Sequence, residues 1–399
     1  MAQAGEGVVI VGGGLAAART AMALRDLQYP GRITLLSDET HLPYDRPPLS
    51  KGYLLGKLAE DRIRLLAPAK VEELGIELLT GVAASALDRA HRRVLLADGR
   101  WLGYEQLVVA TGARPNRLAA FEGFDNVHVL RNLDDADRLR AALGPGRRLC
   151  IIGAGFIGLE IASTAIELGC QVELIEAAAT PLAAILGGRL GTRVQRWHEG
   201  KGAVFHCGAQ VARVVGAGSV QALELSSGTT VTADAFVVGV GQSASIAWLA
   251  GSGLELDRGL VCDEHGRTAD ARVFGVGDAT CIRSGGRLRP TRHWTATTEQ
   301  ARRAAAALCG QVDAEPVIED NYFWSDQYGL RLQFVGRVPD EPQLVWVAGS
   351  EQDERFAVLC CTGGREKQAT AVFSLGCVRD FLTHSMPLRR GEPIPVPAS

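Results

Sequence analysis

The beginning of the chain has a pattern of apolar and polar positions that predicts a strand, a turn and a helix. Residues 8–11 form an uninterrupted β-branched run, a glycine-rich turn follows, and an alanine-rich stretch continues to about Leu27. The turn has the spacing G-x-G-x-x-A, made by Gly12, Gly14 and Ala17. In a dinucleotide-binding unit the first glycine permits a tight turn, the second admits a pyrophosphate, and the third small residue lets helix and strand pack closely.

A second strand supports this interpretation. Residues 32–36 are apolar apart from Arg32 and Thr34, and two carboxylates, Asp38 and Glu39, follow closely. An acidic residue at the end of the second strand can accept hydrogen bonds from ribose hydroxyls. The strand, the helix and the acid at this distance therefore predict a dinucleotide site, which the glycine motif alone would indicate only weakly.

The same pattern occurs again near the middle of the chain. The apolar run 149–152 precedes a G-x-G-x-x-G turn, and the next apolar run ends at Glu176. The glycines of this turn are Gly153, Gly155 and Gly158. Later in each unit another apolar strand is predicted, and each is followed by a glycine. The first ends at Thr111-Gly112 and the second at Gly241.

Two such units in one chain predict an α/β protein with two Rossmann-type domains that resemble a duplication. A protein that holds two dinucleotides has few uses other than transferring a hydride between them, so we expect an oxidoreductase. At the second site, Glu176 is followed by Ala177, Ala178, Ala179 and Thr180, with no basic residue. A carboxylate there accepts ribose hydroxyls and repels a 2′-phosphate, which predicts NADH rather than NADPH.

Composition narrows the function classes. The 399 residues are 47% hydrophobic and carry a net charge of −3, which disfavours a nucleic-acid binder. We expect no membrane span and a cytoplasmic location, since the N-terminal residues lack the basic and apolar regions of a secretory signal. The nine cysteines show no C-x-x-C pair and the eight histidines no ligand spacing, so no metal site is expected.

Segment 42–51, with the sequence LPYDRPPLSK, resembles the signature of FAD-dependent, NADH-linked ferredoxin reductases. These enzymes serve bacterial Rieske-type aromatic-ring dioxygenases and some cytochromes P450, and they are relatives of rubredoxin reductases and apoptosis-inducing factor. Further similar segments cover nearly the whole chain, at 110–115, 130–131, 158–160, 273–278 and 322–327.

The resemblance implies a glutathione-reductase-like fold in three parts. A discontinuous FAD domain would occupy 1–112 and 243–316, an NAD domain 113–242, and a C-terminal α/β domain 317–399. The sequence agrees for the last part, where apolar runs between 330 and 373 predict a meander of strands and residues 378–384 a short helix. Glutathione reductase places a redox-active cysteine pair beside its flavin, whereas the corresponding loop 44–51 contains no cysteine, so disulfide chemistry is not expected.

The resemblance also implies roles for particular residues. Lys51 would lie near the flavin N5 and pair with Glu160, and both are the expected catalytic residues. A carboxylate beside a buried ammonium offsets the cost of removing that ammonium from water. Together with the first glycine turn, its acids and Thr111-Gly112, the expected FAD-binding residues are Arg46, Lys51, Arg131, Asp278, Trp294 and Trp324. The second glycine turn, Glu160, Glu176 and Gly241 would bind NAD.

The implied activity is transfer of a hydride from NADH to FAD, followed by single electrons to a [2Fe–2S] ferredoxin that feeds an oxygenase. Rubredoxin reductase, NADH oxidase and a redox-sensing flavoprotein of the apoptosis-inducing type remain alternatives, and the protein could be a monomer or a homodimer. Arg283, Arg287, Arg289 and Arg292 form a candidate basic docking patch. The chain departs from the family in two places. No basic residue occurs between Glu176 and Arg189, and segment 242–245 lacks the usual asparagine.

Overall fold

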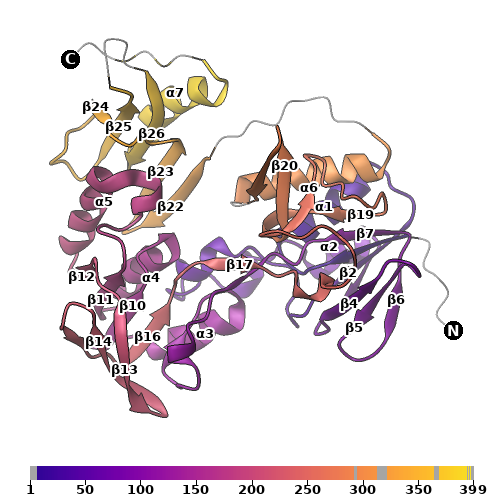
Figure 1. Cartoon of the computed structure of the whole chain (residues 1–399), viewed down its shortest axis with the longest axis horizontal. Coiled ribbons are helices and arrows are strands. Elements are labelled where there is room, and N and C mark those ends of the chain that lie inside the picture. Colours follow the sequence, from indigo (N-terminus) through magenta and orange to yellow (C-terminus); the bar gives the residue numbers. More distant parts are fainter. Residues whose placement is uncertain are drawn as a thin grey trace. The chain divides into compact units, whose positions relative to one another are not determined.

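The computed structural model describes residues 7–291, 294–311, 321–363, 368–392, 394 and 396. The chain forms two compact units (Figure 1). The first unit comprises Met1–Arg46, Leu58–Arg114 and Gln242–Val317, and the second comprises Pro47–Lys57, Pro115–Gly241 and Ile318–Ser399. The first unit resembles the predicted FAD domain, except that Pro47–Lys57 belongs to the second unit. The division into three domains stays a prediction.

The first unit is built on a parallel five-stranded sheet in the order β19-β7-β1-β2-β3. Its strands are β1 (Gly7–Val11), β2 (Arg32–Leu36), β3 (Ile76–Leu79), β7 (Gln106–Val109) and β19 (Val273–Gly275). Successive side chains of β1 face opposite ways, so Val8 and Ile10 join one buried cluster and Val9 and Val11 another. This two-sided burial explains why the strand is an uninterrupted apolar run.

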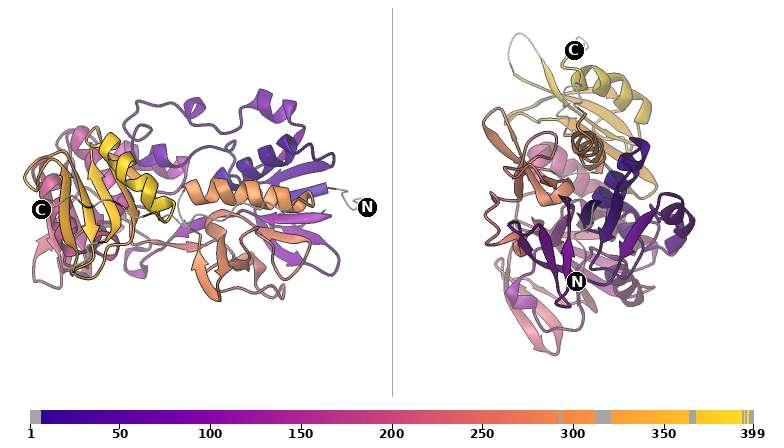
Figure 2. Two further views of the ribbon diagram at one scale, coloured as in Figure 1. Left: turned by 90° about the horizontal axis from the view of Figure 1, so that it is seen from above. Right: turned by 90° about the vertical axis from the view of Figure 1, so that its right-hand side faces the viewer.

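Helices and a small sheet cover the two faces. On one face α1 (Leu15–Asp26) packs against α6 (Trp294–Leu308). The short helix α2 (Pro68–Glu73) packs against the same apolar cluster through Val71. The other face is covered by the antiparallel sheet of β4 (Ala84–Asp88), β5 (Arg93–Leu96) and β6 (Trp101–Gly103). Figure 2 shows α6 lying along the sheet of this unit.

The second unit repeats this plan with the order β12-β11-β10-β16-β9, again parallel. Its strands are β9 (Val127–His128), β10 (Arg148–Ile152), β11 (Gln171–Glu176), β12 (Ala203–Cys207) and β16 (Ala235–Val238). The helices are α3 (Leu133–Ala142), α4 (Phe156–Glu167) and α5 (Ala183–Glu199). An antiparallel sheet of β13 (Val211–Ala217), β14 (Ser219–Leu225) and β15 (Thr230–Val231) occupies the place that β4–β6 take in the first unit. The predicted pair of Rossmann-type folds is confirmed.

A third five-stranded sheet, antiparallel, forms the C-terminal part of the second unit. It contains β22 (Phe323–Gln327), β23 (Leu330–Gly336), β24 (Gln343–Ala348), β25 (Phe356–Cys361) and β26 (Ala369–Leu375), and α7 (Val378–Arg389) packs on one face. The predicted meander is wrong in one respect, because the order is β22-β23-β26-β25-β24. The last strand inserts between β23 and β25, where both of its edges find hydrogen-bonding partners.

Shorter elements complete the described chain. The strands are β8 (Ala113–Pro115), β17 (Gln242–Ala244), β18 (Leu260–Cys262), β20 (Thr280–Ser284) and β21 (Arg287–Pro290). The 3₁₀ turns are η1 (Pro47–Ser50), η2 (Glu60–Arg62), η3 (Ala119–Phe121), η4 (Ala247–Leu249) and η5 (Gly277–Ala279). Within the described ranges, every helix is too short or too polar to cross a bilayer.

Candidate dinucleotide sites and their charged partners

The first glycine turn has a backbone that only glycine can adopt. Gly12 has a φ of +139°, and a Cβ there would lie 2.1 Å from the carbonyl oxygen of Ala110 at the end of β7. Gly14 caps α1 without a side-chain hydrogen bond, and the first turn of the helix contains no acidic residue. The N–H groups of this helix end are therefore open to an anion, and the positive end of the helix dipole points the same way. The turn fits the pyrophosphate of a dinucleotide.

Two further predicted residues lie at this turn. A Cβ at Gly14 would be 3.8 Å from Nε of Arg46, so the guanidinium lies beside the turn. A Cβ at Gly277 would be 3.0 Å from the Cβ of Ala16, which places Asp278 next to the start of α1. Asp278 and the first glycine turn, although far apart in the sequence, therefore lie close together; their role in binding FAD stays a prediction.

The two acids after β2 are not equivalent. Glu39 accepts hydrogen bonds from the Tyr44 hydroxyl and from Arg46, whose Nη2 lies 2.6 Å from its Oε1. Asp38 is exposed. Each oxygen of Glu39 has one partner and keeps a further lone pair, and Asp38 is open to solvent, so both acids stay candidates for the ribose.

Other predicted FAD residues are divided between the units. In the first unit, Thr111 Oγ1 donates to the carbonyl of Ser245 at 2.7 Å, and Gly112 follows with a φ of +67°. Trp294, the first residue of α6, donates from Nε1 to Asp45 at 2.9 Å. Lys51, Arg131 and Trp324 belong to the second unit.

The second glycine turn repeats the geometry of the first. A Cβ at Gly153, where φ is +105°, would be 2.4 Å from the carbonyl oxygen of Gly239, and a Cβ at Gly158 would be 2.2 Å from that of Gly153. Gly155 caps α4 with no side-chain hydrogen bond, and a Cβ there would have open space. This turn therefore also fits a pyrophosphate.

Glu176 is the last residue of β11, and its side chain contacts this turn. Its Oε2 accepts the Ala154 N–H and its Oε1 accepts the Ala178 N–H, both at 2.8 Å. These two bonds fix the carboxylate in place, and each oxygen keeps a further lone pair for a hydroxyl. Gly241 has a φ of +92°, and its carbonyl accepts the N–H of Asn116, a residue that the sequence had not indicated.

The structure brings Lys51 and Glu160 together, although they are 109 positions apart in the sequence. Lys51 Nζ lies 2.7 Å from Oε2 of Glu160, and their side chains are 18% and 7% exposed. The same carboxylate accepts the hydroxyl of Ser50, and its Oε1 accepts the hydroxyl of Ser325 at 2.6 Å. Thr164, one turn further along α4, donates to the carbonyl of Ser50 at 2.7 Å and anchors the lysine loop to the helix.

The hydrogen bonds continue beyond Ser325 into residues that sequence reasoning missed. Gln327 Nε2 lies 2.8 Å from Ser325 Oγ, His198 Nε2 lies 2.7 Å from Gln327 Oε1, and the Tyr328 hydroxyl lies 2.9 Å from His198 Nδ1. Burial lowers the pKa of His198 to about 4, while the hydrogen bond to Gln327 acts in the opposite direction. His198 is therefore a neutral imidazole at ordinary pH.

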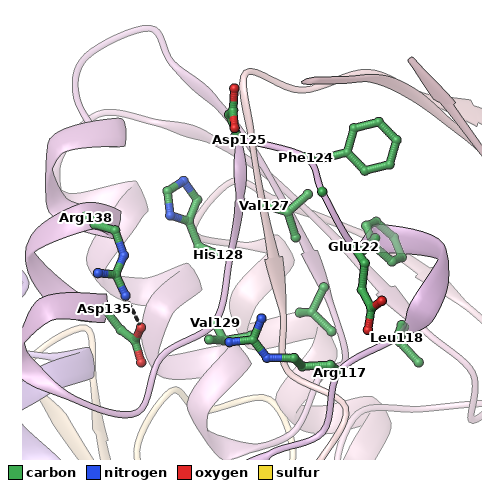
Figure 3. A pocket seen from close by; sticks show the side chains of 13 residues that line it. Arg117, Leu118, Glu122, Phe124, Asp125, Val127, His128, Val129, Asp135 and Arg138 are labelled. Atoms are coloured by element: carbon green, nitrogen blue, oxygen red, sulfur yellow. Dashed lines mark hydrogen bonds and ion pairs between the residues drawn. The ribbon is translucent and has the colours of Figure 1, made fainter. Parts of the chain in front are cut away.

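A separate cavity of about 490 Å³ lies in the second unit (Figure 3). It is lined by β9, the beginning of α3 and segment 117–125, and Arg138 pairs with Asp135 at its edge. Burial, with Arg138 as a further cause, lowers the pKa of His128 in this cavity. None of the predicted cofactor-binding residues lines it. In the part of the chain that the structure describes, no cluster of three metal-ligating side chains occurs.

Comparison with known proteins identifies the family of the chain. Residues 6–306 match the family described as pyridine nucleotide-disulphide oxidoreductase, and residues 322–397 match the family described as reductase C-terminal. The chain belongs to the pyridine nucleotide-disulphide oxidoreductase family. Membership implies the use of FAD and NAD(H).

Two relatives match the chain over most of its length. It is 39% identical over 348 residues to "Probable ferredoxin reductase CtmF" of Castellaniella defragrans, which covers 86% of this chain and 84% of that protein. It is 35% identical to putidaredoxin reductase CamA of Pseudomonas putida, over 91% of this chain and 87% of the relative.

Two solved structures have a fold similar to that of this chain. The putidaredoxin reductase in a covalent complex with putidaredoxin has a TM-score of 0.90 at 33% identity, covering 97% of this chain and 94% of that one. The ferredoxin reductase for the CYP199A2 system from Rhodopseudomonas palustris also has a TM-score of 0.90 at 33% identity, covering 98% and 96%. These similarities show a fold that is shared with both solved structures along nearly the whole chain.

Replacing Gly12 with alanine should prevent retention of FAD. The φ of +139° and the 2.1 Å approach to Ala110 leave no room for a Cβ, and the strain should cost about 3 kcal/mol. The measurement is the ratio of flavin to protein absorbance after purification, with thermal unfolding beside it. Gly144→Ala, where a Cβ would meet nothing within 4 Å, is the control and should keep the normal ratio. A Gly12→Ala protein with full flavin content would contradict the assignment.

His198 should make the protein less stable as the pH falls. Its pKa is about 4 when folded and about 6.5 when unfolded, so below pH 6.5 the unfolded chain binds a proton that the folded chain refuses. Its contribution is full well above pH 6.5, and about 2 kcal/mol of it should be lost by pH 5. Urea unfolding of His198→Gln should show a shallower dependence over this range. The control is His91→Gln, since the His91 side chain is 70% exposed; parallel curves for wild type and His198→Gln would refute the prediction.

Proposed function

We propose that this chain is an FAD-containing NADH:ferredoxin reductase that supplies single electrons to a [2Fe–2S] ferredoxin, which in turn feeds an oxygenase. The observation that carries the proposal is the loop that leads to Lys51. It holds an ammonium paired with a buried carboxylate and contains no cysteine, unlike the disulfide-forming loop of glutathione reductase. Without a redox disulfide in this loop, electrons would pass from the flavin to the acceptor without a thiol relay there. Relatives at 33–39% identity include proteins named ferredoxin reductase and putidaredoxin reductase.

When bound, the flavin supplies the chemistry, because it accepts two electrons as a hydride and releases them one at a time. The chain's contribution is to hold its own groups in place. Gly12 and Gly14 would receive the FAD pyrophosphate, and Lys51 would present a positive charge to the flavin. Glu160 pairs with that ammonium at low exposure, and the paired carboxylate offsets the loss of water.

The NAD site would distinguish NADH from NADPH through Glu176. Both carboxylate oxygens are fixed by backbone N–H groups, so the negative charge cannot easily turn away from a 2′-phosphate. Fixed oxygens with free lone pairs are suited to the two ribose hydroxyls of NADH.

The candidate docking patch for a ferredoxin lies partly on the hairpin of β20 and β21. Arg287 pairs in register with Ser284 and Arg289 with Ile282, so these two arginines share one face of the hairpin. Arg283 projects from the opposite face, where it forms an ion pair with Glu255. Arg292 lies outside the described residues. We therefore propose Arg287 and Arg289 as the part of the patch that can contact one partner.

NADH should be preferred over NADPH by at least about tenfold in kcat/KM, because a fixed carboxylate repels the 2′-phosphate by more than 1.4 kcal/mol. Glu176→Gln should reduce this ratio by raising the activity with NADPH. The control is Glu173→Gln on the same strand, where the carboxylate contacts His206. Equal activity with the two coenzymes in the wild type would exclude the assignment of Glu176.

The function itself is tested by spectroscopy followed by an acceptor assay. The purified protein should show an oxidised flavin spectrum that bleaches when NADH is added without oxygen. The reduced protein should then reduce a [2Fe–2S] ferredoxin at least about tenfold faster than rubredoxin or O₂. Faster reduction of rubredoxin or O₂ would instead identify a rubredoxin reductase or an NADH oxidase. Slow turnover with all three and a long-lived complex with NAD would identify a redox sensor.

A further inference from the structure

A line of hydrogen bonds between buried side chains ends on the carboxylate of Glu160. It runs from Tyr328 through His198, Gln327 and Ser325, with donor–acceptor distances of 2.9, 2.7, 2.8 and 2.6 Å. Each of the three central side chains belongs to a residue that is at most 1% exposed. Burying so many polar groups costs free energy unless each is hydrogen-bonded, whereas apolar side chains could fill the same space without that cost.

The Glu160 carboxylate, at one end of this line, determines which group donates in every hydrogen bond. The ionised carboxylate of Glu160 only accepts, so the Ser325 hydroxyl donates its one proton to it and must accept from the Gln327 amide group. The Gln327 carbonyl oxygen then accepts from N–H at His198 Nε2. The Nδ1 atom of the neutral imidazole is left to accept the Tyr328 hydroxyl, whose pKa is raised by burial. All four donors thus point toward the carboxylate, and such chains polarise one another.

The backbone of β22 and the turn after it position the array. Ser325 and Gln327 alternate along the strand and therefore face the same side. The chain then reverses in a two-residue turn, in which Tyr328 and Gly329 have φ values of +50° and +73°. This is the conformation of the tight hairpin turns that suit twisted strands, and the Tyr328 N–H donates to Ser163 of α4 at 2.7 Å.

We propose that Ser325, Gln327 and His198 are positioning residues that fix the Glu160 carboxylate and, through it, the ammonium of Lys51, thereby tuning the reduction potential of the bound flavin. The inference rests on the proposed function, in which Lys51 presents its charge to the flavin. The carboxylate has two oxygens: one takes Lys51 and Ser50, and the other takes Ser325. Without the hydrogen bond from Ser325, the Glu160 carboxylate can rotate, and the Lys51 ammonium can move with it.

The test compares two buried serines of one sheet in the FAD-loaded protein. Ser325→Ala removes the donor to Glu160. Ser374→Ala in β26 is the control, because Ser374 is equally buried and, within the described residues, its hydroxyl has no hydrogen-bond partner. Ser325→Ala should slow flavin reduction by NADH in a single turnover about tenfold, as expected for one hydrogen bond to a charged group. It should also make the flavin midpoint potential more negative, whereas Ser374→Ala should change neither quantity.

A double mutant separates positioning from a general structural effect. In a Lys51→Met background, Ser325→Ala should have no further effect on the potential or the reduction rate, because its influence passes through the lysine. Equal effects in the two backgrounds would overturn the inference, as would a Ser325→Ala protein that behaves like Ser374→Ala while Lys51→Met alters both readouts. If Lys51→Met itself alters neither, the proposed role of the lysine in the function fails instead.

Discussion

The arrangement of the second unit depends on one electrostatic requirement: the ammonium of Lys51, 18% exposed, needs a fixed negative charge beside it. Removing such a charge from water costs several kcal/mol, and only a well-placed partner with its own hydrogen bonds offsets this cost. Glu160 is that partner. Its carboxylate gathers donors from the loop before Lys51 and from β22 of the C-terminal sheet. The C-terminal part is thereby tied chemically to the loop and to α4.

The glycine turns impose a different constraint, which is steric. At Gly12 and Gly153 the backbone passes within about 2.5 Å of where a Cβ would stand, so the close approach of neighbouring strands excludes every other residue. The consequence is a pair of helix ends whose N–H groups face outward without side-chain caps. Buried side chains thus hold the charge of Lys51 in place, whereas backbone N–H groups at the two helix ends are available to phosphates.

Much of the fold could be predicted from the sequence, because its causes are local. Uninterrupted β-branched runs such as residues 8–11 indicate strands buried on two faces, and the glycine spacing marks the turn after each. The strand order of the C-terminal sheet could not be predicted, since apolar alternation sets which side is buried but not which strand is the neighbour. The pairing of Arg46 with Glu39 could not be predicted either, because both acids after β2 look alike in sequence.

The site was predictable only in part. The pairing of Lys51 with Glu160 followed from the resemblance. The resemblance also covered segment 322–327, but it gave no role to Ser325 or Gln327, and nothing in the sequence indicated His198. A serine and a glutamine two residues apart on a strand resemble a solvated face, and a histidine 127 residues earlier has no spacing that connects it to them. Hydrogen bonds between neutral side chains arise from the tertiary fold, and no periodicity records them.

The two parallel sheets also differ in when they can be completed during synthesis. All five strands of the second sheet lie between residues 127 and 238, whereas the first sheet needs β19, at Val273–Gly275, for its edge beside β7. A chain that leaves the ribosome from its N-terminus therefore has every strand of the inserted sheet available before the interrupted one can close. Until then, β7 has an unpaired edge that a nascent chain must shield from wrong neighbours.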